Sequence, residues 1–343
     1  MGLRTSSGRA MSPPVQAGIL TGSFVYGPVP SRRLGRSLGI NNIPPKRCSY
    51  SCVYCQLGST INLQMERRTF YQPQEIADSV RNKVTLLRAN GEIIDYLAFV
   101  PDGEPTLDIN LGRMIDLLRD LNLEIAVITN ASFIWNEDVQ HDLQKADWIC
   151  LKVDAVTQEI WRRINKPGRK TDINDILAGI LSFAELFHGE LNSETMLIRG
   201  INDSEDEISK IAEFLSQLKL SKAFLAVPTR PTAESIEPTT EQILNTSYQT
   251  FKEKLNRVEY LTGYEGNTFS STGDTIDDLL SITAVHPMRE DALVEFLKHA
   301  GHDWKIVQDL INSRNLIAVA YQGKKYYMRK LPEISQSNKD QDS

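Results

Sequence analysis

Cysteine is scarce in this sequence, with four in 343 residues. A count this low in a long chain argues against a disulfide framework. Long apolar runs are also missing, since none approaches the roughly 18 residues needed to cross a membrane, and no membrane partner is expected. Positive charge is not in excess, because the formal net charge is −6. That balance argues against indiscriminate nucleic-acid binding, while a local basic patch stays compatible with it.

The two ends of the chain are polar. Residues 1–16 are rich in Ser, Gly, Pro and Arg and lack the apolar segment of a signal peptide. Residues 1–22 are therefore predicted to be a disordered leader and residues 333–343 a disordered tail. The length between them predicts one large and one small domain, at residues 23–281 and 282–332.

Strands and helices are predicted to alternate through the large domain. The predicted strands cover residues 38–43, 95–100, 124–129, 148–153, 194–198, 223–227 and 258–261, and the helices cover residues 72–90, 111–121, 136–145, 158–164, 172–187, 204–218 and 239–254. Such alternation is typical of a parallel sheet with right-handed crossovers. The expected fold class is α/β, a partial TIM-like (β/α)6 barrel.

The C-terminal residues are predicted to form a different unit. Helices are expected at residues 289–300 and 303–313, after a short turn of helix at residues 274–280. Residues 316–321 and 325–329 then read as a hairpin. Two helices and a hairpin resemble a winged-helix module. The cations Lys324, Lys325, Arg329 and Lys330 suit phosphate contact, and the alternative is a solvated hairpin.

Three of the four cysteines lie in one stretch, Cys48, Cys52 and Cys55, with the spacing C-x3-C-x2-C. A cubane [4Fe–4S] cluster takes thiolate ligands, so three cysteines hold three irons and leave the fourth open to a small chelating ligand. The alternative is part of a zinc site. Closed zinc sites take four protein ligands, and the next candidates, His141 and Cys150, are distant in sequence.

The cysteine stretch resembles the signature of the radical S-adenosylmethionine (SAM) superfamily, including an aromatic residue, Tyr54, before the last cysteine. The resemblance implies that Cys48, Cys52 and Cys55 are catalytic metal ligands. It also implies that SAM chelates the open iron and that reduction splits it into methionine and a 5′-deoxyadenosyl radical. A reductant such as flavodoxin or ferredoxin is then an expected partner, and oxygen-sensitive chemistry suits the cytoplasm.

Residues 27–33, Gly-Pro-Val-Pro-Ser-Arg-Arg, resemble a subgroup of iron–sulfur oxidoreductases related to wyosine (tRNA) base synthases. Those synthases carry a second cluster with its own cysteines, whereas this chain has only Cys150 left. Asp102-Gly103-Glu104-Pro105 resembles the superfamily's Gly-Gly-Glu-Pro turn, which binds the SAM amino group. The departure is Asp102, which stands where the first glycine is usual.

Polar residues follow the predicted strands, where ligands gather in parallel α/β folds. The resemblance makes cofactor-binding candidates of Tyr54, Asp102, Gly103, Glu104, Asn130, Asp154, Arg199 and Val227. Substrate candidates are Arg32, Arg33, Lys152 and Arg230. Several have an ordinary alternative: a turn of turn-favouring residues for 102–105, a helix cap for Asn130, a mutual salt bridge for Lys152 and Asp154, and surface charges for Arg32, Arg33 and Arg199.

Three functions fit these features. The leading one is a radical SAM enzyme that opens a C–H bond of a substrate such as a tRNA or other RNA base. The second is an activase that makes a glycyl radical on a partner protein, with the winged helix docking that partner. The third is a non-catalytic iron–sulfur sensor whose winged helix binds DNA, for which the Gly-Glu-Pro turn is unnecessary.

Overall fold

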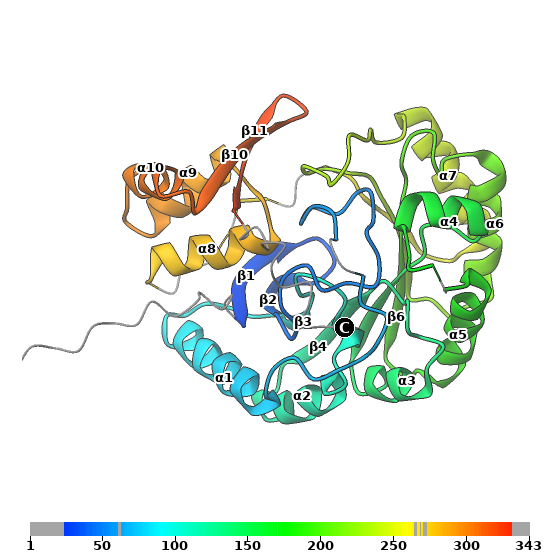
Figure 1. Ribbon diagram of the computed structural model, residues 1–343, viewed down its shortest axis with the longest axis horizontal. Helices are drawn as coiled ribbons and strands as arrows, with labels where there is room; N and C mark the ends of the chain where they lie inside the picture. The colour runs from blue at the N-terminus through cyan, green and yellow to red at the C-terminus, as the bar shows by residue number, and fades with distance from the viewer. Residues whose placement is uncertain are drawn as a thin grey trace, which may run out of the picture.

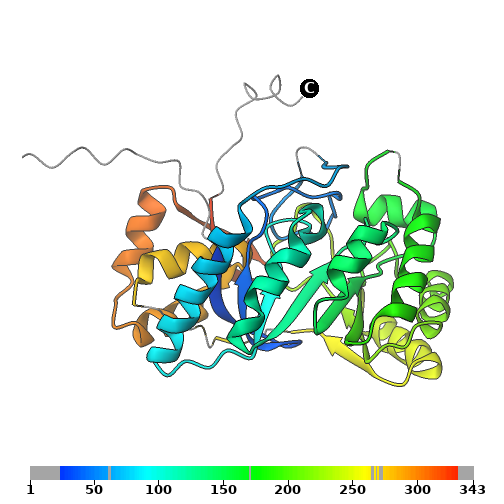
Figure 2. The same cartoon turned by 90° about the horizontal axis from the view of Figure 1, so that it is seen from below.

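The computed structural model describes residues 24–60, 63–169, 171–263, 266–267, 269 and 273–330. The predicted leader and the tail at residues 333–343 lie outside the described residues. An eight-stranded sheet runs in the order β1 to β8, and helices cover its outer face (Figure 1, Figure 2). The strands are β1 Val25–Ser31, β2 Gly35–Ile40, β3 Tyr96–Phe99, β4 Glu124–Thr129, β5 Trp148–Lys152, β6 Glu190–Met196, β7 Lys222–Ala226 and β8 Val258–Leu261.

Strands β2 to β8 are parallel, and β1 pairs antiparallel with β2 at the edge. The crossover helices are α1 Pro73–Ala89, α2 Leu111–Leu118, α3 Glu137–Leu143, α4 Gln158–Asn165, α5 Ile173–Leu186, α6 Glu205–Ser216 and α7 Glu241–Lys254. The sheet curls into an open half-barrel (Figure 1). The predicted partial α/β barrel is thus confirmed. The six predicted repeats begin with β2 to β7, β8 is the further strand predicted at residues 258–261, and β1 was not predicted.

Strand β2 covers Gly35–Ile40, three residues earlier than the predicted 38–43, and two other strands differ more from the prediction. The first, β1, was not predicted because Gly27, Pro28 and Pro30 are unusual in strands, and prolines are tolerated here because β1 is an edge. The second, β6, covers Glu190–Met196, whereas the sequence predicted 194–198. Its buried residues include Asn192, Ser193, Glu194 and Thr195. The start of this strand was not predicted because its polar side chains lack the apolar pattern of a buried strand. The apolar residues that follow it placed the predicted strand too late in the sequence.

The two faces of the sheet differ in the side chains that they carry, and this difference decides where a ligand fits. Residues facing the helices are bulky, as in Leu97, Phe99 and Val127, and pack into the main core. Residues facing the barrel interior alternate with them and include Ala98, Ala126 and Ala226. The same inner cluster also contains Trp148 and Phe224, which fill part of the interior, and the small residues leave the remaining space.

The C-terminal elements form a unit of their own against β1, the C-terminal module. It comprises α8 Thr275–Val285, β9 Met288–Arg289, α9 Glu290–His299, α10 Lys305–Asn312, β10 Leu316–Tyr321 and β11 Lys324–Arg329. The strand order is β10-β11-β9, and the predicted hairpin is β10–β11. Helix α8 is longer than predicted and spans residue 282, the predicted boundary. Its Leu279 and Ile282 share one core with Phe296 of the module and with Tyr26 and Val29 of β1.

No helix in the described part of the chain is both long and apolar enough to span a membrane.

Candidate functional site

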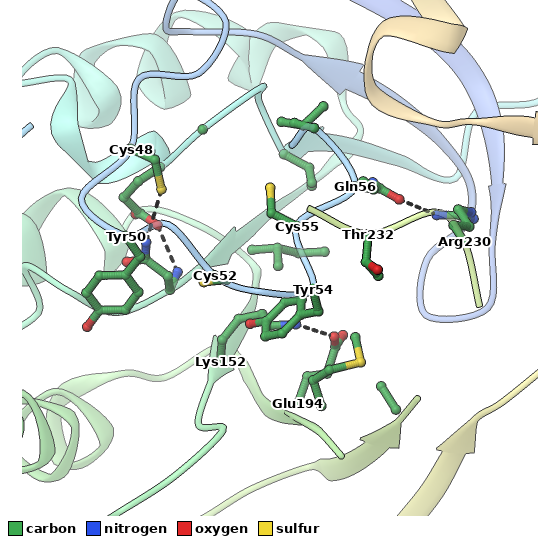
Figure 3. A pocket seen from close by; sticks show the side chains of 18 of the residues that line it. Cys48, Tyr50, Cys52, Tyr54, Cys55, Gln56, Lys152, Glu194, Arg230 and Thr232 are labelled. Carbon is green, nitrogen blue, oxygen red and sulfur yellow. Dashed lines mark hydrogen bonds and ion pairs between the residues drawn. The ribbon is translucent and has the colours of Figure 1, made fainter. Parts of the chain in front are cut away.

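A cavity of about 290 Å³ opens at the carboxyl ends of β3 to β8 (Figure 3). This end of a parallel barrel is where ligands bind, because the loops after the strands converge there. The predicted site residues that line it are Arg32, Arg33, Cys48, Cys52, Tyr54, Cys55, Asp102, Gly103, Glu104, Asn130, Lys152, Val227 and Arg230. The fold therefore brings together residues that lie as much as 198 positions apart in the chain, from Arg32 to Arg230.

The cysteine loop is held by the C-terminal end of α4. The last carbonyls of a helix lack partners within it, and here the loop supplies them. The Ser51 N–H donates to the Asn165 carbonyl at 3.1 Å, and the Val53 N–H donates to the Ile164 carbonyl at 2.9 Å. Lys166 ends the helix in the left-handed conformation, with φ of 43°. The loop conformation is therefore set by protein hydrogen bonds on this side.

The turn after β3 holds the other side of the loop. The Lys46 N–H donates to the Asp102 carbonyl at 2.8 Å, and the Glu104 N–H donates to the Arg47 carbonyl at 3.1 Å. A Cβ atom on Gly103 would lie 1.8 Å from the Arg47 carbonyl oxygen. Glycine is required at this position because the two backbones touch, and the backbone φ plays no part.

Glu104 ties the turn to the end of β4. Its carboxylate is 1% exposed and accepts bonds from the Thr106 N–H and hydroxyl, the Thr129 hydroxyl and the Asn130 N–H, at 2.6 to 3.0 Å. Burial raises the pKa of this carboxyl, and the four hydrogen bonds oppose that rise. Glu104 thus fixes the turn and Asn130 relative to each other.

Two asparagine side chains donate to cysteine sulfurs. Asn130 Nδ2 lies 3.5 Å from Cys48 Sγ, and Asn165 Nδ2 lies 3.4 Å from Cys52 Sγ. The sequence analysis did not identify Asn165, because nothing in the last residue of a helix signals contact with a loop 113 residues away. Burial raises the pKa of Cys48 and brings that of Cys52 to about 12. Both thiols are protonated until a metal displaces the protons.

Asp102 places a carboxylate in this part of the cavity. It is 3% exposed, and its Oδ1 has no hydrogen-bond partner among the described residues. Burial raises its pKa to about 7. A buried carboxylate without a partner is costly, and a cationic group bound in the cavity would supply the missing partner.

The opposite wall carries paired charges. Glu194 of β6 accepts from Lys152 Nζ at 2.5 Å and from the Arg33 guanidinium. The Lys152 ammonium also lies 4.8 Å from the centre of the Tyr54 ring (Figure 3). Two cations share one carboxylate, which leaves this wall with an excess of positive charge. The predicted salt bridge of Lys152 with Asp154 is replaced by one with Glu194, since Lys152 faces the barrel interior.

Asp154 and Arg199 do not line this cavity. Asp154 is buried beneath it, where its carboxylate accepts from the Tyr54 hydroxyl, Asn165 Nδ2 and the Met196 N–H. It therefore orients other groups of the site. Arg199 is 58% exposed at its side chain and pairs with Glu237. Its position does not support the expected contact with the SAM carboxylate.

The C-terminal module completes the rim of the cavity. Gln56, which follows Cys55, donates to the Val285 carbonyl at 2.8 Å and accepts from Arg230 at 3.1 Å (Figure 3). Arg230 also lies 3.0 Å from His286 Nε2. The hydroxyl of Tyr326 donates to the Thr229 carbonyl at 2.9 Å, and Thr229 lines the cavity. The hairpin thus touches the loop after β7 directly.

Three comparisons bear on the family and the fold. The model of the radical SAM superfamily matches residues 42–215. The UPF0026 protein of Methanocaldococcus jannaschii is 45% identical over 90% of this chain and 97% of its own length. The UPF0026 protein of Synechocystis sp. is 36% identical over 60% of this chain and 76% of its own length. A radical SAM methyltransferase structure from Sphaerobacter thermophilus covers 66% of this chain and 67% of that one, with a TM-score of 0.50 at 16% identity, which concerns the fold alone.

The residues of the cavity fit the cofactors of this family. Among the described residues, no three His, Cys, Asp or Glu side chains are grouped to bind one metal ion. A zinc site needs several ligands around one ion, and the described residues offer no such group. In a cubane each thiolate binds a separate iron, so the three cysteines need not converge on one point. Oδ1 of Asp102, which has no hydrogen-bond partner among the described residues, suits the positive charges of SAM. When bound, the cluster supplies the electron that cleaves SAM to methionine and a 5′-deoxyadenosyl radical. The chain belongs to the radical SAM superfamily and uses a [4Fe–4S] cluster with S-adenosylmethionine.

Proposed function

We propose that this protein is a radical SAM enzyme that modifies a base in RNA, with tRNA as the first candidate, and that its C-terminal module is a winged helix that contacts RNA phosphates. The observation that carries the proposal is the position of the β10–β11 hairpin. Its Tyr326 hydroxyl bonds to Thr229 on the rim of the cysteine-lined cavity. A macromolecule bound on the hairpin would present a segment to that cavity.

The order of elements in the module supports the winged-helix assignment. A helix, a short strand, two helices and a hairpin follow one another, and the short strand β9 pairs with β11. Winged helices bind nucleic acid or protein, so the order alone leaves the partner open. The resemblance of residues 27–33 to the wyosine-related subgroup favours RNA.

Charge favours RNA as well. Residues 298–330 contain seven Lys or Arg and two Asp, a net charge of +5, in a chain of net charge −6. Lys298, Lys305, Arg314, Lys324, Lys325 and Lys330 are all exposed. Phosphate contacts by such cations supply most of the sequence-independent affinity for nucleic acids. A basic segment at residues 298–330 of an acidic chain would favour RNA contact at this part of the molecule.

The cavity itself suits radical chemistry on a bound group. The cysteine wall holds the cofactors, and the Arg33–Glu194–Lys152 wall faces the remaining space. The protein's part is to position the substrate and exclude water, since the cofactors carry the hard chemistry. The reductant would be a flavodoxin or ferredoxin of the cytoplasm.

The test begins anaerobically with reconstituted protein, SAM and a strong reductant, and 5′-deoxyadenosine is quantified by mass spectrometry. We expect the wild type to form it, bulk tRNA to increase the rate, and Cys55→Ala to form none. The tRNA is then digested and searched for a new nucleoside. No stimulation by any RNA, together with a radical signal on a partner protein, would replace this proposal by the activase.

The hairpin is tested by Lys324→Ala with Lys325→Ala. Loss of two phosphate contacts is expected to flatten the slope of log K against log salt by about 2. Lys210→Ala is the matched control, because Lys210 is an exposed lysine on α6, away from the hairpin. Equal slopes in all three proteins would show that RNA binds elsewhere. Sequence-specific DNA binding without SAM cleavage would instead revive the sensor.

A further inference from the structure

We propose that Asn165 is a positioning residue for the iron–sulfur cluster, and that its side-chain N–H···S bond to Cys52 sets the reduction potential of the cluster. The inference rests on the contacts around one carboxamide and does not depend on the substrate. Asn165 is the last residue of α4 and is 3% exposed. It lines a small buried space beside Asp154, outside the main cavity.

Both hydrogens of the carboxamide nitrogen are used. Nδ2 lies 3.4 Å from Cys52 Sγ and 2.8 Å from Asp154 Oδ2. A carboxylate only accepts hydrogen bonds, so Asp154 determines which end of the carboxamide faces it. The nitrogen must point toward Asp154, and its second hydrogen then points toward the sulfur.

Asp154 is itself held in place. The Tyr54 hydroxyl also donates to its Oδ2, and the Met196 N–H donates to its Oδ1 at 2.9 Å. Tyr54 belongs to the cysteine loop and Met196 ends β6. The orientation of the Asn165 side chain is therefore fixed from the loop and from the sheet at once.

The backbone keeps donor and sulfur together. The N–H groups of Ser51 and Val53, on either side of Cys52, donate to the carbonyls of Asn165 and Ile164. The loop and the end of α4 can therefore move only as one piece. These two backbone bonds hold the main chains of Cys52 and Asn165 side by side, and the bond to Asp154 holds the carboxamide that reaches the sulfur.

Hydrogen bonds to the sulfurs are one of the ways in which a protein sets the potential of an iron–sulfur cluster. Reduction adds negative charge, which spreads onto the thiolates, and a donor stabilises the more negative state. Asn165 keeps its proton throughout, and the electron comes from the external reductant. The bond therefore raises the potential and makes the cluster easier to reduce.

Asn130 makes a similar contact with Cys48 at 3.5 Å, but it also lines the main cavity and bonds to Ser49. A change at Asn130 would disturb cofactor binding as well as the sulfur. Asn165 is the better test, because it contacts the sulfur from outside the cavity.

The experiment is a reductive titration of the reconstituted protein without SAM, followed by electron paramagnetic resonance, with iron and sulfide counted per chain. Asn165→Leu keeps the size and removes both donors. We expect its potential to shift to a more negative value with the iron count unchanged. Asn165→Gln keeps a carboxamide donor and is expected to recover part of the shift. Asn202→Leu is the matched control, because Asn202 is a buried asparagine that donates to the backbone carbonyls of Asp154 and Met196.

The proposal is overturned if Asn165→Leu titrates at the wild-type potential, or if Asn202→Leu shifts as far. Should Asn165→Leu fail to hold a cluster, Asn165→Ser takes its place. The serine side chain is too short to reach both Cys52 and Asp154, so the same shift of the reduction potential to a more negative value is expected. A wild-type potential in that variant would equally refute the role of Asn165.

Discussion

The two walls of the cavity are built by different physical means. The cysteine wall is held by backbone hydrogen bonds from α4 and from the turn after β3, and by the four bonds to Glu104. The opposite wall is held by two ion pairs of long side chains with Glu194. Backbone bonds persist when a side chain is replaced, whereas an ion pair is lost when either of its side chains is replaced. The walls should therefore respond differently to mutation.

The largest effect is expected from Gly103→Ala on the cysteine wall. The added Cβ would lie 1.8 Å from the Arg47 carbonyl oxygen, so the turn and the loop must separate. The atoms that clash most closely are backbone atoms, which cannot turn aside as a flexible side chain can, so we expect loss of cluster incorporation, measured as iron per folded chain. Gly189→Ala is the control, because its Cβ would lie 2.5 Å from the Asp147 carbonyl oxygen, away from the site. If that variant loses iron as fully, the loss reflects general instability.

Glu104→Ala is expected to have the next largest effect. It leaves the N–H groups of Thr106 and Asn130 and the Thr129 hydroxyl without their shared acceptor. Unpaired buried donors cost about 1–3 kcal/mol each, so the free energy of unfolding should fall by at least about 3 kcal/mol in urea titrations. Glu104→Gln keeps one acceptor oxygen and should lose less. Equal losses would mean that the charge, and not the bonding, matters.

Asp102 predicts a pH dependence. Its pKa is raised to about 7 in the folded, cofactor-free protein, from 3.8 as the ordinary value. The folded state therefore binds more protons than the unfolded state between these values, and stability falls as pH rises, by at most about 1.4 kcal/mol per pH unit. Asp102→Asn should flatten the fall measured between pH 4 and 7. A curve identical to that of the wild type would show that Asp102 titrates normally.

The smallest effect on stability is expected from Glu194→Gln on the opposite wall. It removes the shared partner of Lys152 and Arg33, whose side chains are 15% and 20% exposed and can turn toward water. We expect a loss of about 1–2 kcal/mol, below the 3–5 kcal/mol of a fully buried pair. The formation of 5′-deoxyadenosine without RNA should stay within about two-fold of wild type, with stimulation by tRNA reduced. If Glu194→Gln failed to hold the cluster, the two walls would not differ in their response to mutation, and the comparison would be wrong.

The same distinction decides what could be predicted from the sequence. The cysteine spacing and Gly103-Glu104-Pro105 are local patterns, so the residues of the cysteine wall were predicted from contiguous stretches of sequence. Asn165, Gln56 and Glu194 join the site through contacts with distant segments, and no local pattern marks them. Arg199 shows the converse, since it follows a strand yet points to solvent.

The fold was predictable to a similar degree. Hydrophobic periodicity located the parallel strands that alternate with helices. It failed at β1, whose prolines look like turn residues, and at β6, whose polar side chains face the barrel interior. In both cases the position in the sheet, at an edge or beside a cavity, outweighed the intrinsic preference of the residues.

The bond between Gln56 and the Val285 carbonyl joins residues 229 positions apart, and this has a consequence for biosynthesis. On the ribosome the N-terminal part of a chain folds first, so the cysteine loop emerges long before the module that closes the rim. A nascent chain would expose its three thiols, together with Tyr26 and Val29 of the shared core. Cluster insertion before release would meet a site without the module at its rim, whereas insertion after release would meet a site whose rim is complete. The separation of Gln56 and Val285 in the sequence therefore determines that the cysteine loop is synthesised before the module that completes the rim.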